Sequence, residues 1–511
     1  MTAMKNQRLA FFLFCMGFCL VLAPYVNSQE EPSLQAHHEY HRQAVERANA
    51  SVAEAQKKVE GDATRPAYHF QPPALWNNDP NGPIQYQGEY HMFYQHNPYG
   101  ENWGHMHWGH AKSRDLAHWE HLPIAIAPSK DRGEDHCFSG CCVIADDGAP
   151  TILYTSIGPD TPAGDGAVQW EAISRDGMLT WEKHPQNPVM TGALHGDLKV
   201  LDWRDPFAWK EGGAWYVVLG GHPKEERGAA FIYRSDDLVH WKFLNILYES
   251  KPEDEEGNWE CPNFFQLGGK RVLIYSPHKR VMYHTGTMNG DFAFQSEYRA
   301  MLDYSSNFYA PNCLEDQYGR RLLWGWIRGI KGDGWQCAMT LPRQLTLRSD
   351  GSLGMTPAGE IQLLRKNHRS KDAAKVTSAP IPVEPIQNCA KEIRVVYRGG
   401  AADAYGLRIT IPGENAREIP IVWDRKENTV GIGDAKGPFT LSDGERELAF
   451  DLFIDKAIAE LYVNDRACCT AVIPELNSSA AVLELYAVNG SADCRSVDVW
   501  DMDSMWSTGS M

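Results

Sequence analysis

The chain of 511 residues has little positive charge and, after its first thirty residues, no long apolar run. Its 49 Lys and Arg stand against 66 Asp and Glu, which gives a formal net charge of −17. Such a surface repels phosphate backbones and anionic lipid headgroups, so neither nucleic acid nor a membrane surface is an expected partner. No segment beyond the first thirty residues is apolar for long enough to span a bilayer.

The sequence also lacks the cysteine patterns of a zinc site or of a disulfide scaffold. Twelve Cys are present, of which Cys15 and Cys19 precede residue 28, and no Cys-x-x-Cys pair is followed by His at zinc-site spacing. The remaining ten are too few for a disulfide scaffold in a chain of this length. No metal is therefore expected, and the pairing of these cysteines stays open.

Residues 1–28 have the composition of a secretory signal peptide. Lys5 and Arg8 form a basic start, and the apolar stretch Leu9–Leu22 is shorter than a membrane span. Small residues at 26–28 resemble a cleavage site. We therefore expect a secreted or periplasmic protein that leaves the membrane once the signal is removed. An uncleaved membrane anchor is the alternative.

Helical periodicity is confined to one segment, residues 33–60, within an N-terminal lead-in at 29–67. Apolar residues recur there at helical spacing: Val45, Ala48, Val52, Ala55 and Val59. From residue 68 to 348, short β-type runs are separated by Gly, Pro, Asn and Asp. The sequence thus predicts one amphipathic helix followed by an all-β region.

One short motif occurs three times in this β region, at Ser113–Trp119, Ser174–Trp181 and Ser235–Trp241. The final Trp residues lie 62 and 60 residues apart, and a weaker copy stands at Asn289–Phe294. A β unit that repeats at this interval is typical of a propeller blade. We therefore expect residues 68–348 to form a five-bladed β-propeller, in which the motif is a structural turn between strands.

The last part of the chain consists of two segments that differ in composition. Residues 349–384 are rich in Lys, Ser and Pro and are interpreted as a linker. Residues 385–511 alternate apolar and polar side chains between turn signals, which predicts an antiparallel β-sandwich. The expected fold class is all-β, a propeller followed by a sandwich.

Three carboxylates in the expected propeller stand among aromatic or rigid residues. Asp79 begins a turn-like Asp-Pro-Asn-Gly sequence, Asp205 follows Arg204, and Glu260 follows Trp259. A neighbouring Arg would hold Asp205 ionised, and an aromatic wall would favour the protonated form of Glu260. Glycoside cleavage needs one carboxylate that attacks the anomeric carbon and a protonated one that serves the leaving oxygen.

These residues belong to six motifs that, in order and spacing, resemble the invertase and fructanase family, glycoside hydrolase family 32. The motifs are Trp76–Gly82, Phe93–Pro98, Trp103–His110, Phe138–Gly140, Trp203–Pro206 and Trp259–Pro262. The resemblance implies a five-bladed propeller with a β-sandwich and a retaining mechanism through a covalent fructosyl-enzyme. It implies that Asp79 is the nucleophile, Glu260 the acid/base and Asp205 a stabiliser of the transition state.

The same resemblance implies a fructose pocket and no metal or organic cofactor. The matching pocket positions are Trp76, Asn78, Gln95, Trp103, Trp108, Phe138, Ser139, Arg204, Tyr309 and Trp326. Two positions depart from the family pattern, because Asn263 and Asn307 stand where Asp is common. Both departures remove a carboxylate near the rim of the pocket and leave the three central acids unchanged.

The expected function is release of terminal, non-reducing β-D-fructofuranosyl units from sucrose or fructans by an exported hydrolase. Three alternatives stay open. A fructosyltransferase would use the same intermediate, a related propeller glycosidase would act on arabinan or xylan, and a non-catalytic propeller would only bind carbohydrate. A small carbohydrate is the expected partner in every case, and the sequence gives no oligomeric state.

Overall fold

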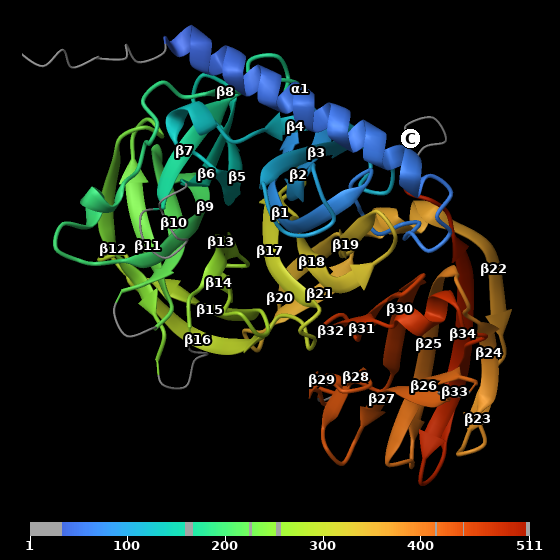
Figure 1. Cartoon of the computed structure of the whole chain (residues 1–511). Coiled ribbons are helices and arrows are strands. Elements are labelled where there is room, and N and C mark those ends of the chain that lie inside the picture. The colour runs from blue at the N-terminus through green and yellow to red at the C-terminus, as the bar shows by residue number, and fades with distance from the viewer. Residues whose placement is uncertain are drawn as a thin grey trace, which may run out of the picture.

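The computed structural model describes residues 33–158, 167–223, 227–251, 257–413, 416–442 and 444–506. Strands dominate these residues and form two groups of sheets, with one long helix lying across the first group (Figure 1). The all-β expectation is confirmed. The expected signal peptide lies outside the described residues. In the ranges given, no helix is both long enough and apolar enough to cross a membrane.

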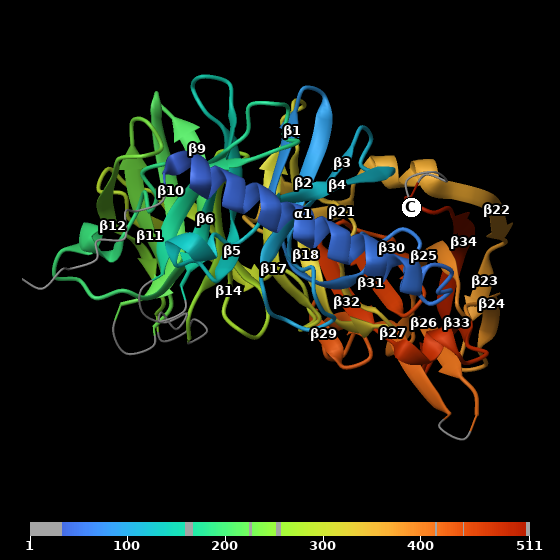
Figure 2. The ribbon, with the colours of Figure 1, turned by 45° about the horizontal axis from the view of Figure 1, so that its top comes forward.

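The helix α1 (Leu34–Val59) confirms the amphipathic segment expected from the sequence. The Ser33 side chain caps its start by accepting the backbone N–H of Ala36. Its buried face packs Ala48 and Val52 against β4 (Trp119–Ile126) and its neighbours. The Asn49 side chain accepts the backbone N–H of Ile124 in this strand. Figure 2 shows α1 lying along the outer side of the strands.

Three N-terminal sheets are four-stranded and antiparallel, with their strands in chain order. The first holds β5 (His136–Ile144), β6 (Pro150–Ile157), β7 (Val168–Ile173) and β8 (Glu182–Lys183). The second holds β9 (Leu201–Glu211), β10 (Ala214–His222), β11 (Ala229–Ser235) and β12 (Trp241–Glu249). The third holds β13 (Glu260–Leu267), β14 (Lys270–Ser276), β15 (Met282–Met288) and β16 (Phe294–Met301).

A nine-stranded sheet joins the beginning of this region to its end. Its strands are β1 (Leu75–Tyr86), β2 (Glu89–Asn97), β3 (His107–Ser113), β4 (Trp119–Ile126), β17 (Phe308–Glu315), β18 (Arg321–Lys331), β19 (Trp335–Met339), β20 (Arg343–Leu347) and β21 (Leu353–Pro357). The link is a short parallel pairing of β1 with β19 at Leu75–Trp335 and Trp76–Gln336. Short 3-10 helices are η1 (Lys130–Arg132), η2 (Gly192–His195), η3 (Gly359–Leu364) and η4 (Pro474–Asn477).

The repeated sequence motif forms the turn between the third and fourth strands of its group, as expected. In the first copy, the Asp115 carboxylate accepts the backbone N–H groups of Ala117 and His118. Asp237 makes the equivalent bonds in the third copy. The final Trp of both copies donates its indole N–H to a carbonyl inside the same turn. The motif therefore closes turns and does not belong to the chemistry.

The C-terminal residues form two facing sheets around one apolar core, as the sandwich prediction requires. One sheet contains β22 (Arg365–Lys371), β23 (Ala374–Val376), β25 (Ala390–Gly400), β30 (Leu448–Asp455), β31 (Ile458–Val463), β32 (Ala467–Val472) and β34 (Ala492–Met502). The other contains β24 (Ile381–Pro385), β26 (Ala404–Ile411), β27 (Arg417–Asp424), β28 (Thr429–Ile432), β29 (Ala435–Pro438) and β33 (Val482–Val488).

The linker expected at residues 349–384 needs correction, because much of this segment is paired. β21 pairs with β20 in the nine-stranded sheet, and β22 and β24 are edge strands of the two sandwich sheets. An edge strand leaves one side of its ladder unpaired and most of β22 is exposed, so Lys, Ser and Pro are tolerated there. The composition of an edge strand therefore resembled that of a linker.

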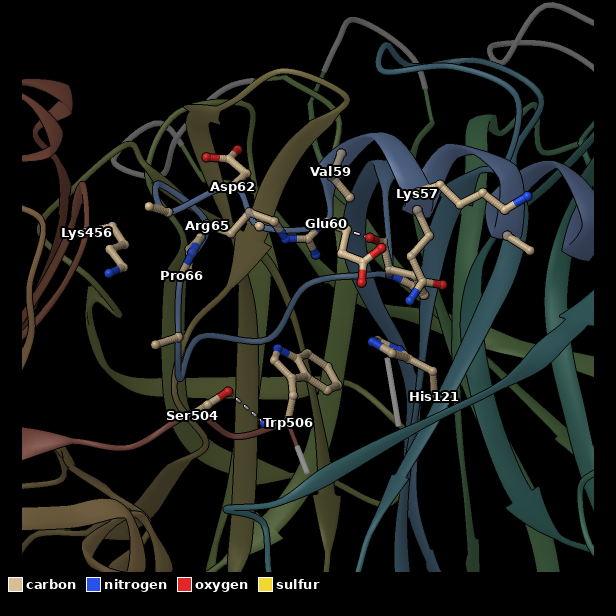
Figure 3. Close-up of a pocket in the computed structure, with 16 residues that line it drawn as sticks. Lys57, Val59, Glu60, Asp62, Arg65, Pro66, His121, Lys456, Ser504 and Trp506 are labelled. Atoms are coloured by element: carbon tan, nitrogen blue, oxygen red, sulfur yellow. Dashed lines mark hydrogen bonds between the residues drawn. The ribbon is translucent and has the colours of Figure 1, made fainter. Parts of the chain in front are cut away.

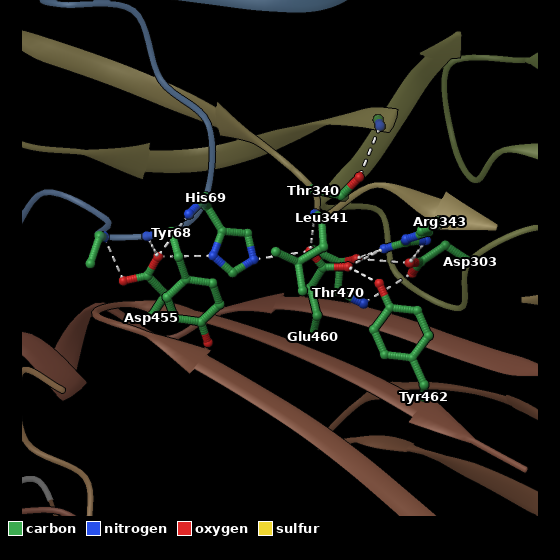
Figure 4. A network of polar contacts seen from close by, with 12 residues as sticks. Tyr68, His69, Asp303, Thr340, Leu341, Arg343, Asp455, Glu460, Tyr462 and Thr470 are labelled. Atoms are coloured by element: carbon green, nitrogen blue, oxygen red, sulfur yellow. Dashed lines mark hydrogen bonds and ion pairs between the residues drawn. The ribbon is translucent and has the colours of Figure 1, made fainter. Parts of the chain in front are cut away.

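A buried network of charged residues connects the chain before β1 and at β20 to the sandwich (Figure 4). His69 lies between Asp455 (Nδ1 to Oδ2, 3.0 Å) and Glu460 (Nε2 to Oε1, 3.0 Å), and Arg343 donates to Glu460 and to Asp303 at 2.7 and 2.9 Å. Burial alone would lower the pKa of His69, but its bonds to the two carboxylates outweigh burial and raise it to about 9. We call these five residues the junction cluster.

A cavity of about 600 Å³ lies where the end of α1, the chain that follows it, β4 and the C-terminal segment meet (Figure 3). Val59, Arg65, Lys456 and the stacked rings of His121 and Trp506 are among its lining residues. Asp79, Asp205 and Glu260 do not line this cavity. The carboxylate site described next is therefore separate from it.

Candidate active site

The three acids expected from the sequence come together from strands of three different sheets. Asp79 is on β1, Asp205 on β9 and Glu260 begins β13, and β9 contacts both β5 and β13. The Cys261 thiol links two of the acids, since its Sγ lies 3.5 Å from Asp79 Oδ2 and 3.6 Å from Asp205 Oδ2. Residues some 180 positions apart in the sequence thus share one site.

Asp79 is oriented by short polar contacts on both oxygens. Ser139 Oγ donates to Oδ2 at 2.6 Å and Asn78 Nδ2 donates to Oδ1 at 3.1 Å, while the Trp76 indole N–H holds Asn78 at 2.8 Å. Burial raises the pKa of Asp79, although these hydrogen bonds oppose the rise. The site therefore keeps this carboxylate fixed and poorly hydrated, as a nucleophile requires.

The turn-like sequence after Asp79 lies inside a strand and bends it. Irregularities interrupt the β1–β2 register between Asn77 and Pro80 and again between Asn81 and Ile84. Gly82 has φ +43°, and a Cβ atom at this position would approach a backbone nitrogen of β5 to 2.6 Å. Pro and Gly are thus needed for a bulged strand that turns Asp79 toward the site.

Asp205 occupies a left-handed backbone conformation, with φ +63°, which is uncommon for a residue other than glycine. Its Oδ2 accepts the backbone N–H of Cys261 at 2.9 Å. Burial raises the pKa of Asp205 to about 7, although Arg204 opposes the rise. The expectation that Arg204 holds Asp205 ionised is therefore corrected, because its Nε stays 3.8 Å away while its terminal nitrogens donate to Asp202 and Glu260.

Both oxygens of Glu260 face donors. Arg204 donates to Oε1, the Tyr309 hydroxyl donates to Oε2 at 2.5 Å, and His278 Nδ1 lies 3.4 Å from Oε2. Burial and the neighbouring Glu260 carboxylate raise the pKa of Tyr309, so its hydroxyl remains a donor. These contacts fix the direction in which Glu260 can deliver or accept a proton.

The aromatic side chains near the acids differ in how far they are exposed. Trp76, Phe138 and Trp326 pack together, and Trp103 is 53% exposed with its ring edge-on to Phe138 at 6.0 Å. Trp108 is fully buried, and its indole N–H donates to the Phe138 carbonyl at 2.9 Å.

Gln95, another expected pocket residue, is 2% exposed and donates to the Cys137 carbonyl at 2.8 Å. Gln95 and Trp108 therefore both bond to the backbone of β5, the strand that carries Ser139, whereas Trp103 is exposed.

Two further residues at the site carried no clear sequence signal. His278 follows β14 in a loop without a motif, and Arg328 on β18 places its guanidinium 4.2 Å from the centroid of the Tyr309 ring. Cys261 lies in the motif Trp259–Pro262, but nothing in the sequence indicated that its thiol contacts Asp79 and Asp205. Burial and the carboxylates raise the pKa of Cys261, so it remains a thiol. The ten described cysteines are all unpaired.

Comparison with known proteins agrees with this geometry. The chain matches the model of the glycosyl hydrolases family 32 N-terminal domain at residues 69–357 and that of the family 32 C-terminal domain at 360–501. It is 32% identical over 474 residues to the sucrose-6-phosphate hydrolase of Escherichia coli, covering 86% of this chain and 96% of that protein. It is also 32% identical over 478 residues to an Escherichia coli raffinose invertase, with coverage of 86% and 95%.

Solved structures are similar over almost the whole chain. The β-fructofuranosidase of Bombyx mori has a TM-score of 0.75 and 29% identity, covering 90% of this chain and 99% of that one. The fructan 1-exohydrolase IIa of Cichorium intybus, solved with 1-kestose, has a TM-score of 0.74 and 26% identity, with coverage of 86% and 98%. Two family models that together span most of the described residues establish the relationship: the chain belongs to glycosyl hydrolase family 32.

Proposed function

We propose that the protein is a β-fructofuranosidase that hydrolyses terminal, non-reducing β-D-fructofuranosyl units of sucrose or fructans. The observation that carries the proposal is the convergence of the three acids: the Cys261 thiol contacts Asp79 and Asp205, and Arg204 joins Asp205 to Glu260. Similarity to a raffinose invertase and to a β-fructofuranosidase that was solved with sucrose supports this substrate class.

The proposed reaction is a double displacement that retains the anomeric configuration. Asp79 attacks C2 of the fructosyl unit while Glu260 gives its proton to the glycosidic oxygen, so the C–O bond to the leaving sugar breaks as the bond to Asp79 forms. Glu260 then takes a proton from water, and the water oxygen displaces Asp79 from C2. Asp205 holds sugar hydroxyls, and its burial strengthens these interactions.

The fold that supports this reaction is proposed to be a five-bladed β-propeller. Four blades are β1–β4, β5–β8, β9–β12 and β13–β16, and the fifth combines β17 and β18 with β20 and β21. The first strands of these groups supply the site: β1 carries Asp79, β5 Ser139, β9 Asp205, β13 Glu260 and β17 Tyr309. This arrangement is what a propeller axis requires.

Export is part of the proposal, with residues 1–28 as the signal peptide. Expression of the full chain in a secreting host, followed by cell fractionation and N-terminal sequencing, tests it. We expect active protein outside the cytoplasm whose sequence starts near Gln29. Full-length protein retained in the cytoplasm would contradict export.

Product analysis of the purified protein tests the proposed activity. We would offer sucrose, sucrose 6-phosphate, raffinose, inulin and levan separately and identify the sugars released over time. Free fructose from any of these substrates supports hydrolysis, and the ranking of rates identifies the preferred one. Fructo-oligosaccharides in place of free fructose would support transfer to sugar. Release of arabinose from arabinosides, or tight sugar binding without any product, would overturn the proposal.

A further inference from the structure

A buried hydrogen-bonded pair on β6 and β7 contacts the segment that carries Asp205. Thr155 and Gln169 are opposite each other in the two strands, and both are fully buried. The Thr155 hydroxyl donates to Gln169 Oε1 at 2.7 Å and accepts the backbone N–H of Asp205 at 2.9 Å. Gln169 Nε2 donates to the Trp203 carbonyl at 3.3 Å. The pair therefore holds both ends of the Trp203–Asp205 segment.

This segment needs external support because its backbone is strained. Asp205 has φ +63° in a buried position, where an N–H group without a partner is costly. Thr155 supplies the acceptor, and Gln169 fixes the rotation of the Thr155 hydroxyl by accepting its hydrogen bond. The Gln169 backbone N–H is in turn bonded to the Met190 carbonyl at 2.9 Å, which anchors the pair.

We infer that Thr155 and Gln169 are positioning residues for the catalytic site: their hydrogen bonds set the left-handed turn that aims Asp205 and, beside it, Arg204. The inference rests on the proposed function. Since Arg204 donates to Glu260 and Asp205 accepts the Cys261 N–H, movement of this turn would disturb two of the three acids. Neither Thr155 nor Gln169 contacts the acid side chains through a hydrogen bond of its own.

Strand β6 offers a matched control. Thr151 lies four residues before Thr155 and therefore on the same face of the strand, and it is 1% exposed. Its hydroxyl donates to the Ala149 carbonyl at 3.3 Å, in the turn before β6. Thr→Val at either position removes a buried hydroxyl at nearly constant volume, so a general loss of stability would be similar in the two variants.

The experiment compares Thr155→Val, Thr155→Ser and Thr151→Val with the parent protein, by steady-state kinetics on the best fructoside and by thermal unfolding. We expect kcat to fall between about 10-fold and about 100-fold in Thr155→Val, with little change in KM. Thr155→Ser keeps the hydroxyl and should stay within about 3-fold of the parent, as should Thr151→Val. In an Asp205→Asn background, Thr155→Val should cause little further loss, because both changes act through one group.

Crystal structures of the two Val variants provide a readout that does not need turnover. We expect Asp205 to leave its left-handed conformation in Thr155→Val and to keep it in Thr151→Val. Equal kcat values for the two Val variants, or an unmoved Asp205, would overturn the inference. If the parent protein releases no fructose at all, the proposed function fails, and the position of Asp205 in the crystals still decides whether the pair sets the turn.

Discussion

Two clusters of three carboxylates each lie in this molecule and differ in their charge balance. In the candidate active site, Arg204 pairs with Asp205 and Glu260, whereas Asp79 pairs with no Lys or Arg among the described residues. Burial raises the pKa of Asp79, and it raises that of Asp205 to about 7. The fold thus makes ionisation of Asp79 and Asp205 less favourable than it is in water.

The junction cluster, in contrast, supplies two cations for its three carboxylates. Burial would raise the pKa of Glu460, but Arg343 and His69 outweigh burial and lower it to about 2. His69 itself holds its proton up to a pKa of about 9. Burial of an acid therefore says little about its role. The balance between burial and compensating charge separates the acids that we propose to react from those that lie between the two sheet systems.

The sharpest way to break this comparison is to neutralise one acid in each cluster. Asp79→Asn should lower kcat by at least about 10³-fold, because the nucleophile is lost. It should leave thermal stability unchanged or higher, since it removes a desolvated carboxylate that has no cation of its own. Measurements of kcat and of the melting temperature on the same preparation check both expectations. A fall in stability with activity retained would reverse the assignment.

Glu460→Gln is the counterpart in the junction cluster. Removal of this carboxylate leaves Arg343 and His69 buried with too little negative charge, and we expect a loss of about 3–5 kcal/mol in the free energy of unfolding. Urea denaturation gives that value, and kcat at 25 °C should stay close to the parent's. An unchanged unfolding midpoint would mean that the junction cluster does not stabilise the fold.

The two clusters should affect the stability of the fold in different pH ranges. The pKa of His69 is raised from 6.5 to about 9, so its contribution is complete below pH 6.5 and is lost as the pH rises through 9. The shift corresponds to a loss on the order of 3 kcal/mol. The pKa of Asp205 is raised from 3.8 to about 7, so its ionisation opposes folding increasingly between those values.

Unfolding free energies measured from about pH 4 to about pH 10 check both windows. His69→Gln should flatten the alkaline part of the curve, and Asp205→Asn the acidic part. If His69→Gln flattened the acidic part instead, or Asp205→Asn the alkaline part, the pH dependence would have been assigned to the wrong cluster.

The smallest expected effect concerns the contacts that orient Glu260. Tyr309→Phe removes the hydroxyl that donates to Glu260 Oε2 at 2.5 Å and should lower kcat by about 10-fold, as expected for one hydrogen bond to a charged group. Kinetics over a range of pH check the change. Substrates with an activated leaving group should lose less activity, because they depend less on proton delivery. An equal loss with both kinds of substrate would argue against a role in proton transfer.

Local signals in the sequence predicted the helix, the repeated turn and the three acids. Each of these features depends on a short stretch of sequence, such as the Asp-Pro-Asn-Gly segment that bends β1. The junction cluster was not predicted, since His69 and Asp455 lie 386 residues apart and meet only through the packing of two sheet systems.

Composition led to the wrong prediction of a linker at residues 349–384, because edge strands and linkers both tolerate Lys, Ser and Pro. Composition gave no indication that Trp108 is fully buried while Trp103 is exposed, because aromatic residues occur in both settings. The adjacent Arg204 suggested an ionised Asp205, but only the fold shows how fully that carboxyl is buried.

Detection of the covalent intermediate tests the role of Asp79 most directly. The Glu260→Gln variant, given a fructoside with an activated leaving group, should form the intermediate and hydrolyse it slowly. After an acid quench and proteolysis, mass spectrometry should find one fructosyl unit on the peptide that contains Asp79. A fructosyl unit on another residue, or release of fructose with inverted configuration and no adduct, would contradict the account.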